Sequence, residues 1–261
     1  MEETAAAFFT GLDVAGAPRD LVALGGGLDV ETLVAAYRSG CFPWPASGPY
    51  EDPLDRDARR LARRGDVPVL PGTDFGAPLM PWVSPHPRPV LFPQQVSVPR
   101  SLRRRLRQSG WDTTLDAAFD AVIAGCADRD ETWISPAMES AYRALHRAGV
   151  AHSVEVWSGD DLVGGLYGVL TGRVFAGESM FHRTPDASKA GIVDLCQRLV
   201  EAGAVMIDTQ DESEHLAHLG QMLLHRYDYI DLLHHLRDDP VALPTDRRPV
   251  ARLAAARSPD R

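Results

Sequence analysis

Three strand-like runs follow one another near the middle of the chain and constrain the fold more than any other feature. They span residues 153–157, 162–170 and 173–180, and short turns at 159–161 and 171–172 separate them. Short apolar runs bounded by Gly and Asp are typical of β-strands. We therefore expect a sheet in the second half of the chain.

Helical patterns surround these strands. Behind them, Ser188 can cap a helix in which Ile192, Leu195 and Leu199 share one face, and Gly203 ends it. Other helices are predicted at 29–40, 101–108, 115–128, 136–148 and up to about residue 219, with a strand at 204–208. Helix, three strands, helix, strand and helix form a mixed α/β (α+β) order.

The rest of the chain predicts two domains with loose ends. Proline is dense at residues 81–88, which is a plausible boundary. The predicted parts are a loose N-terminus at 1–20, a small N-terminal domain at 21–86 with an irregular insertion at about 45–80, a second domain at 87–242 and a disordered tail at 243–261.

Composition narrows the class of protein. No apolar run approaches the ~20 residues that span a bilayer, and the acidic N-terminus lacks the basic start of a signal peptide. The three cysteines, Cys41, Cys126 and Cys196, are widely spaced in no metal-like pairing. We therefore expect a cytoplasmic protein without a membrane segment, a disulfide framework or a metal site.

Basic residues are unevenly distributed. The net charge is −9, which argues against nucleic-acid binding by the chain as a whole. A local basic patch on an acidic protein can still bind a phosphate backbone, although a solvated helix face is the alternative. Two clusters qualify, one within 56–64 and one formed by Arg100, Arg103, Arg104, Arg105 and Arg107.

Glu178 is an unusual residue for its surroundings. It lies within the apolar run VFAGESMF at 174–181. A carboxylate in such a run is either paired permanently, for example with an arginine, or it awaits a cationic ligand. The residues alone leave both possibilities open.

Seven motifs occur together in one order. They are LGGGLDVETLVAAYRSGCFPW at 24–44, WVSPHPR at 82–88, TWI at 132–134, LHRAGVAHSVEVW at 145–157, GGLYGVLTGRVFAGESMFHR at 164–183, ASK at 187–189 and IDTQ at 207–210. This series closely resembles the leucyl/phenylalanyl-tRNA–protein transferase family. The resemblance extends from about residue 21 to 236.

The resemblance implies a GNAT-like acyltransferase domain preceded by a small N-terminal domain. It also implies an enzyme that moves Leu or Phe, and Met less well, from aminoacyl-tRNA to the α-amino group of proteins that begin with Arg or Lys. The new N-terminal residue marks those proteins for degradation by the bacterial N-end rule pathway. The family implies a monomer with no metal or organic cofactor.

Two substrate subsites follow from the resemblance. The slot for the transferred side chain is implied to contain Leu166, Phe175, Gly177, Leu195 and Leu199. The terminal adenosine and the aminoacyl ester are implied to contact Trp133, Tyr142 and Trp44, because stacking on aromatic faces is favourable. Without the resemblance, these residues would be interpreted as ordinary core residues.

Glu178, Asp208 and Gln210 match the catalytic positions of the family. Alternation along a strand would place Asp208 and Gln210 on one face. A Gln amide is a poor base, so we expect Gln210 to position the attacking amine while the carboxylates provide negative potential for the incoming Arg or Lys. The arginines at 100–107 match the basic residues that contact the tRNA backbone, whereas no role can be carried over for the cluster at 56–64.

Two other functions are compatible with parts of this pattern. One is an acyl-CoA-dependent GNAT N-acyltransferase, although no Arg or Gln here is followed by Gly three residues later, as its pyrophosphate loop requires. The other is a non-catalytic module that binds N-terminal Arg/Lys or tRNA. Such a module would not need both an apolar slot and an adenosine site.

Overall fold

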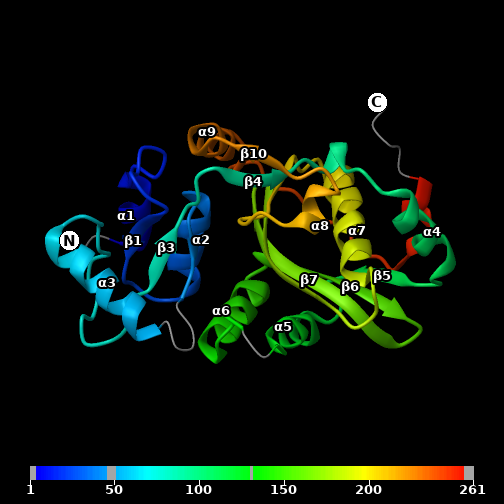
Figure 1. Ribbon diagram of the computed structural model, residues 1–261, viewed down its shortest axis with the longest axis horizontal. Coiled ribbons are helices and arrows are strands. Elements are labelled where there is room, and N and C mark those ends of the chain that lie inside the picture. Colours follow the sequence, from blue (N-terminus) through cyan, green and yellow to red (C-terminus); the bar gives the residue numbers. More distant parts are fainter. Residues whose placement is uncertain (1–3, 46–50, 130–131, 256–261) are drawn as a thin grey trace.

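The structure is a computed structural model that describes residues 4–45, 51–129 and 132–255. The N-terminal elements lie at one end of the molecule, and a large sheet with its covering helices forms the other end (Figure 1). Within the described residues, no helix has both the length and the apolar character needed to cross a membrane.

A small antiparallel sheet organises the N-terminal end. Its strand order is β1 (Leu21–Leu24), β3 (Pro81–Val83) and β2 (Phe42–Pro43). The predicted helix at 29–40 is confirmed as α2 (Val30–Arg38). Asp29 caps it by accepting a 2.9 Å hydrogen bond from the Thr32 amide, and Gly40 follows it with φ of +82°.

Three segments that we expected to be irregular contain ordered elements. Helix α1 (Ala5–Gly11) places Phe9, which is 1% exposed, in the core, so the loose N-terminus is wrong for these residues. Helix α3 (Glu51–Arg64) occupies the supposed irregular insertion. In the supposed tail, β11 (Arg248–Pro249) and the 3₁₀ helix Val250–Ala255 are ordered because Val250 and Leu253 are buried. Residues 1–3, 46–50 and 256–261 lie outside the described part.

The large sheet has eight strands. Its order is β10 (Met222–Leu224), β4 (Arg88–Leu91), β9 (Met206–Asp208), β8 (Val174–His182), β7 (Asp161–Thr171), β6 (Ala151–Ser158), β5 (Asp112–Leu115) and β11. Neighbouring strands are antiparallel except for β8 and β9, which are parallel. The predicted strands at 153–180 and 204–208 are confirmed as β6 to β9.

Helices cover both faces of this sheet. Helix α7 (Ala187–Ala202) packs on one face against β6, β7 and β8. Helices α5 (Phe119–Ala127) and α6 (Pro136–Arg147) pack on the other face (Figure 1). The remaining helices are α4 (Arg100–Gln108), the 3₁₀ helix Pro93–Gln95, α8 (Glu214–Ala217) and α9 (Arg226–Leu236).

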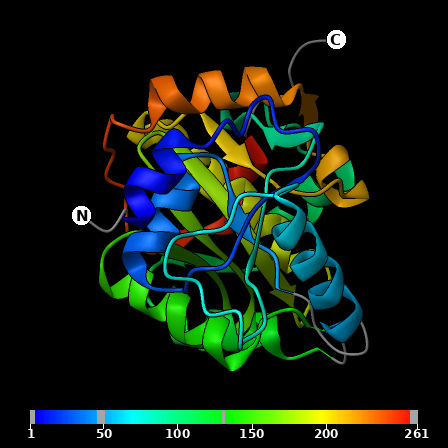
Figure 2. The same ribbon diagram turned by 90° about the vertical axis from the view of Figure 1, so that its left-hand side faces the viewer.

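The mixed α/β class is confirmed, whereas the GNAT-like architecture and the boundaries of the two domains remain predictions. Figure 2, which views the molecule from its N-terminal end, shows α9 and α6 on opposite sides of the N-terminal elements. One capping detail differs from expectation, because α7 begins after Asp186 rather than Ser188.

A β-bulge interrupts the pairing of β7 with β8. Tyr167 lies opposite Ser179, but the next residue, Gly168, lies opposite Gly177, so Glu178 is the extra residue of β8. A Cβ atom at Gly168 would lie 2.2 Å from the Ala176 carbonyl oxygen, so this position requires glycine. Bulges redirect a side chain, and here the redirected side chain is the carboxylate of Glu178.

Candidate active site

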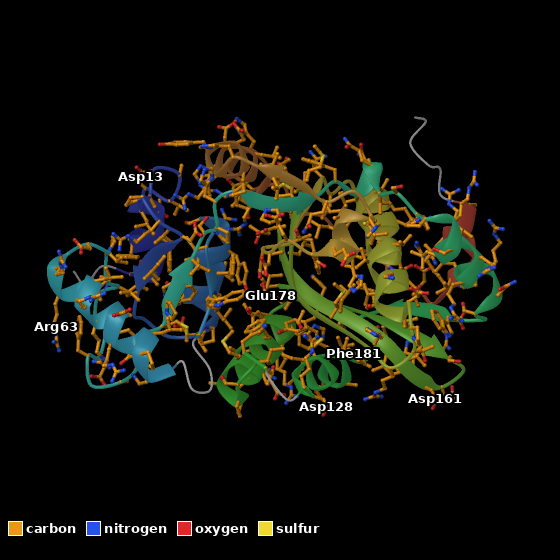
Figure 3. The ribbon with its side chains drawn as sticks, in the orientation of Figure 1. Asp13, Arg63, Asp128, Asp161, Glu178 and Phe181 are labelled. Atoms are coloured by element: carbon orange, nitrogen blue, oxygen red, sulfur yellow. The ribbon has the colours of Figure 1, made fainter. Side chains whose placement is uncertain are left out.

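Glu178 lies on β8, on the side of the large sheet that faces the N-terminal elements (Figure 3). Its Oε1 accepts hydrogen bonds from Tyr37 Oη at 2.7 Å and from Gln210 Nε2 at 2.6 Å. Its Oε2 accepts from Tyr142 Oη at 2.5 Å. Within the described residues, no arginine contacts this carboxylate, so the alternative of a permanent arginine pair is wrong.

Burial and the close contact between Tyr37 and Tyr142 favour a protonated Glu178 carboxyl, whereas the hydrogen bonds that it accepts favour the carboxylate. Tyr37 Oη and Tyr142 Oη also lie 2.7 Å apart, which closes a triangle of three oxygen–oxygen contacts. The two tyrosine hydroxyls have one proton each and can donate in only two of these three contacts. The third contact is a hydrogen bond only when the Glu178 carboxyl carries a proton. Burial raises the pKa of Glu178 to about 7, although the hydrogen bonds from Tyr142, Tyr37 and Gln210 oppose this rise.

Asp208 has a different environment, although it ends the neighbouring strand β9. Arg88 binds it in bidentate fashion, with Nε 2.8 Å from Oδ1 and Nη2 2.5 Å from Oδ2. Tyr229 Oη donates to Oδ2 at 2.9 Å, and the Arg88 guanidinium lies over the Tyr229 ring at 4.4 Å. Arg88 and Asp208 are each 1% exposed. The charge of Asp208 is therefore neutralised inside the protein.

Gln210 reaches Glu178 through a turn rather than along a strand. Strand β9 ends at Asp208, and Gln210 has φ of +62°. The prediction that strand alternation aligns the two side chains is therefore wrong. Instead, the backbone N–H of Gln210 donates to Asp208 Oδ1 at 3.1 Å. This hydrogen bond fixes the turn and directs the Gln210 side chain to Glu178.

A cavity of about 300 Å³ extends from Glu178 into the sheet, and we call it the side-chain cavity. Four of the five predicted slot residues line it, namely Leu166, Phe175, Gly177 and Leu195. Leu199 does not line it, because it lies one turn further along α7 and is fully buried in the core. The remaining apolar lining, which sequence reasoning missed, comes from Met180, Ile192, Ile207 and Leu216.

The side-chain cavity also has polar lining. The Tyr167 hydroxyl is buried and makes no hydrogen bond with any described residue. Asp211 and Glu212 are exposed at the cavity, and no arginine, lysine or histidine of the described chain forms an ion pair with either carboxylate. One cavity thus combines apolar walls with uncompensated negative charge.

Two of the three predicted adenosine-binding aromatics lie side by side. The rings of Trp44 and Trp133 are nearly parallel, with a 13° interplanar angle and 6.2 Å between centroids, and Trp133 also lines the side-chain cavity. Trp44 is 44% exposed. Tyr142, by contrast, is fully buried and binds Glu178, so its ring faces are not available for stacking.

The predicted tRNA-binding arginines lie on α4. Leu102 and Leu106 bury one face of this helix, which leaves Arg100, Arg104, Arg105 and Arg107 exposed. Arg103 is half-buried and donates to the Val98 carbonyl. In the described part, no group of three or more His, Cys, Asp or Glu residues could hold a metal ion.

Sequence reasoning missed three residues that hold the carboxylates of Glu178 and Asp208. Tyr37 and Tyr229 were indistinguishable from core aromatics, because their partners are distant in the sequence. Arg88 did carry a signal, since it ends the motif WVSPHPR.

Comparisons with known proteins identify the family of this chain. Residues 90–234 match the leucyl/phenylalanyl-tRNA protein transferase family, and residues 26–54 match the N-terminal domain of that family. Proteins named leucyl/phenylalanyl-tRNA–protein transferase include one from Pseudomonas aeruginosa PAO1 that is 44% identical over 227 residues, which is 85% of this chain and 88% of the relative. Another, from Shewanella pealeana, is 41% identical over 88% of this chain and 87% of the relative. The chain therefore belongs to the leucyl/phenylalanyl-tRNA protein transferase family.

Proposed function

We propose that this protein transfers Leu or Phe, and Met less well, from aminoacyl-tRNA to the α-amino group of proteins that begin with Arg or Lys. The transfer would mark those proteins for the N-end rule pathway in the cytoplasm. The observation that carries this proposal is the side-chain cavity, whose apolar walls end at Glu178 and Trp133.

The cavity suits an aminoacyl ester. Its volume of about 300 Å³ is at the lower end of the ~300–1,000 Å³ typical of small-ligand sites, which fits one side chain rather than a whole cofactor. An apolar side chain among Leu166, Phe175 and Leu195 would place its ester carbonyl near Glu178. The adenosine would then contact Trp133 and Trp44, at the edge of the cavity.

Glu178 has the properties needed to carry a proton during ester aminolysis. The neutral α-amine attacks the ester carbonyl, a C–N bond forms, and the nitrogen loses a proton to the Glu178 carboxylate. The ester C–O bond then breaks, and the protonated Glu178 returns the proton to the leaving ribose oxygen. A carboxyl with a pKa of about 7 suits both steps near neutral pH.

Gln210 and Asp208 position this group. Gln210 Nε2 holds Glu178 Oε1, and the bidentate Arg88–Asp208 pair holds the turn that carries Gln210. Asp208 is buried and neutralised, so the negative potential that we expected from it has to come from other carboxylates. Asp211 and Glu212 provide that potential at the cavity, where a cationic N-terminal Arg or Lys would lie beside them.

The exposed arginines of α4 complete the substrate contacts. They would bind the acceptor stem of the tRNA through its phosphates, without reading its sequence. Because these contacts are electrostatic, we expect the rate of transfer to fall steeply as the salt concentration rises.

The test uses Phe-tRNA or Leu-tRNA with peptides that begin with Arg, Lys or Ala. A mass gain of one Phe or Leu residue on the first two peptides only is the expected result. A mass gain from acetyl-CoA without aminoacyl-tRNA would support the acyl-CoA-dependent alternative instead. Peptide binding without any product would support the non-catalytic alternative.

A further inference from the structure

A second cavity of about 620 Å³ lies at the start of α7, and we call it the basic cavity. Three cationic side chains from three segments line it, namely Arg129, Arg183 and Lys189. Figure 3 labels Asp128 and Phe181, which also line it. Lys189 is the only lysine in the chain, and its motif ASK has no role in the chemistry described above.

One polar side chain at this cavity forms no hydrogen bond within the described residues. Ser188 lines the basic cavity and is 9% exposed, and its hydroxyl forms no hydrogen bond within the described chain. The Ser188 hydroxyl is therefore free to donate a hydrogen bond to an anionic ligand in the cavity. Its neighbours are the amides of the first turn of α7, which no side chain caps.

The basic cavity adjoins the side-chain cavity. Both are lined by Arg129, Met180, Ile192 and Leu216. The two cavities are therefore neighbours, with these four side chains at their shared boundary. The ester end would lie beside Glu178, and the remainder of the donor would continue past Arg129.

The basic cavity also adjoins α4. Arg105 Nε lies 3.8 Å from Asp186 Oδ2, and Lys189 Nζ lies 3.0 Å from Asp186 Oδ1. These two ion pairs place the exposed arginine face of α4 next to the cavity. They also compensate Asp186, which leaves Asp128 as the other carboxylate among the lining residues.

We propose that the basic cavity binds the phosphodiester groups of the single-stranded 3′ end of aminoacyl-tRNA, between the acceptor stem on α4 and the ester at Glu178. Every tRNA ends in the nucleotides CCA, and those nucleotides join the paired stem to the ester. Lys189, Arg129 and Ser188 contact the phosphates. This inference rests on the proposed function, because it takes aminoacyl-tRNA as the donor.

Coenzyme A is the other ligand that could supply phosphate groups to the basic cavity. A coenzyme A pyrophosphate presents the same anionic oxygens to amides and cations. The continuity with α4 favours the nucleic acid, because a track of exposed arginines beyond the cavity serves a long polyanion and has no use for a single coenzyme. The experiment includes both ligands.

The test measures equilibrium binding of three probes, the trinucleotide CCA without an attached amino acid, adenosine and coenzyme A. Lys189→Gln and Arg129→Gln are each expected to weaken CCA binding about 5- to 10-fold and to change adenosine binding less than about 2-fold. Each should also reduce the slope of log K against log salt by ~0.7, the value for one lost phosphate contact on a single strand. Lys189→Arg should restore part of the affinity.

The matched control is Arg63→Gln. Arg63 is exposed on α3, at the far end of the molecule from Phe181 (Figure 3), so this variant should bind all three probes as the wild type does. A second readout uses the single lysine, since acetylation of Lys189 should be slowed by CCA and unaffected by adenosine.

Three results would overturn the inference: unchanged CCA binding in both variants, an equal loss for CCA and adenosine, or coenzyme A bound more tightly than CCA with the same dependence on Lys189. This experiment measures binding only. Failure of the proposed function is detected separately, by the peptide transfer assay described above. A wild type that binds CCA through Lys189 but forms no product would contradict the function and leave the phosphate site in place.

Discussion

Tyr37 donates a 2.7 Å hydrogen bond to Glu178, although 141 residues separate them in the chain. Tyr37 lies on α2 in the N-terminal part and Glu178 lies on β8 of the large sheet. The N-terminal part therefore contributes directly to the environment of the carboxylate, and it does more than support the sheet.

Replacing Tyr37 should shift the pH dependence of transfer. The Tyr37 hydrogen bond lowers the pKa of Glu178, so Tyr37→Phe raises that pKa and reduces the ionised fraction near neutrality. We expect kcat/KM to fall several-fold at pH 6.5 and much less at pH 8.5. The pH–rate profile of the purified variant checks this. Tyr227→Phe, on the exposed face of α9, is the control and should keep the wild-type profile.

Glu178 should also make the stability of the protein depend on pH. Its folded-state pKa, about 7, lies above the ordinary value of 4.5, so the folded protein binds more protons than the unfolded chain between these values. The contribution is fully present below pH 4.5 and is lost as pH rises through 7. Relative to Glu178→Gln, the wild type should lose about 2 kcal/mol between pH 4.5 and 8, less than the full shift implies because the side chain is only partly buried. Urea unfolding at several pH values measures this, and a constant difference would contradict it.

The Arg88–Asp208 pair should matter for folding before it matters for chemistry. Asp208→Asn leaves the buried Arg88 guanidinium without its counter-charge. Removing one partner of a buried ion pair costs about 3–5 kcal/mol. We expect urea unfolding to show a loss of that size, whereas Asp161→Asn, at the exposed first residue of β7, should change stability by less than about 0.5 kcal/mol. An Asp208→Asn protein of wild-type stability would refute the structural role.

Substitutions at two leucines of α7 should have different effects, one on the choice between Phe-tRNA and Leu-tRNA and the other on the stability of the fold. Leu195 lines the side-chain cavity, so Leu195→Ala enlarges it and should raise the kcat/KM ratio of Phe-tRNA to Leu-tRNA about 3- to 10-fold. Leu199 lies in the core, so Leu199→Ala should cost about 2–5 kcal/mol of stability without changing that ratio. Competition between the two donors in one reaction gives the ratio. Equal ratios in the two variants would mean that Leu195 does not contact the donor.

The strands of the large sheet could be predicted because their turns carry local signals. Gly159 and Gly172 have positive φ angles of +62° and +57° at the two turns that separate β6, β7 and β8. The helix at 51–64 was missed because residues 45–80 are rich in Pro, Gly, Asp and Arg, which suggested irregular structure. Proline is tolerated in the first turn of a helix, and the spacing of Leu54, Ala58 and Leu61 was the signal that could have identified α3.

The candidate site was predictable only in part. The motifs identified Glu178, Asp208 and Gln210, but their partners depend on contacts between distant segments. The turn at Gln210 was not predictable from alternation, since the strand ends two residues earlier. The family resemblance assigned Leu199 to the slot together with Leu195, but one turn of α7 is enough to separate core from cavity.

The bulge at Glu178 makes the length of β8 as critical as its composition. Deleting one residue between 177 and 179 would restore regular pairing with β7 and leave no extra position from which a carboxylate could point at Tyr37 and Tyr142. Insertions and deletions in this hairpin should therefore be eliminated by selection even when they preserve every functional side chain. Across related chains, the spacing from Tyr167 to Ser179 should vary less than the residues that occupy it.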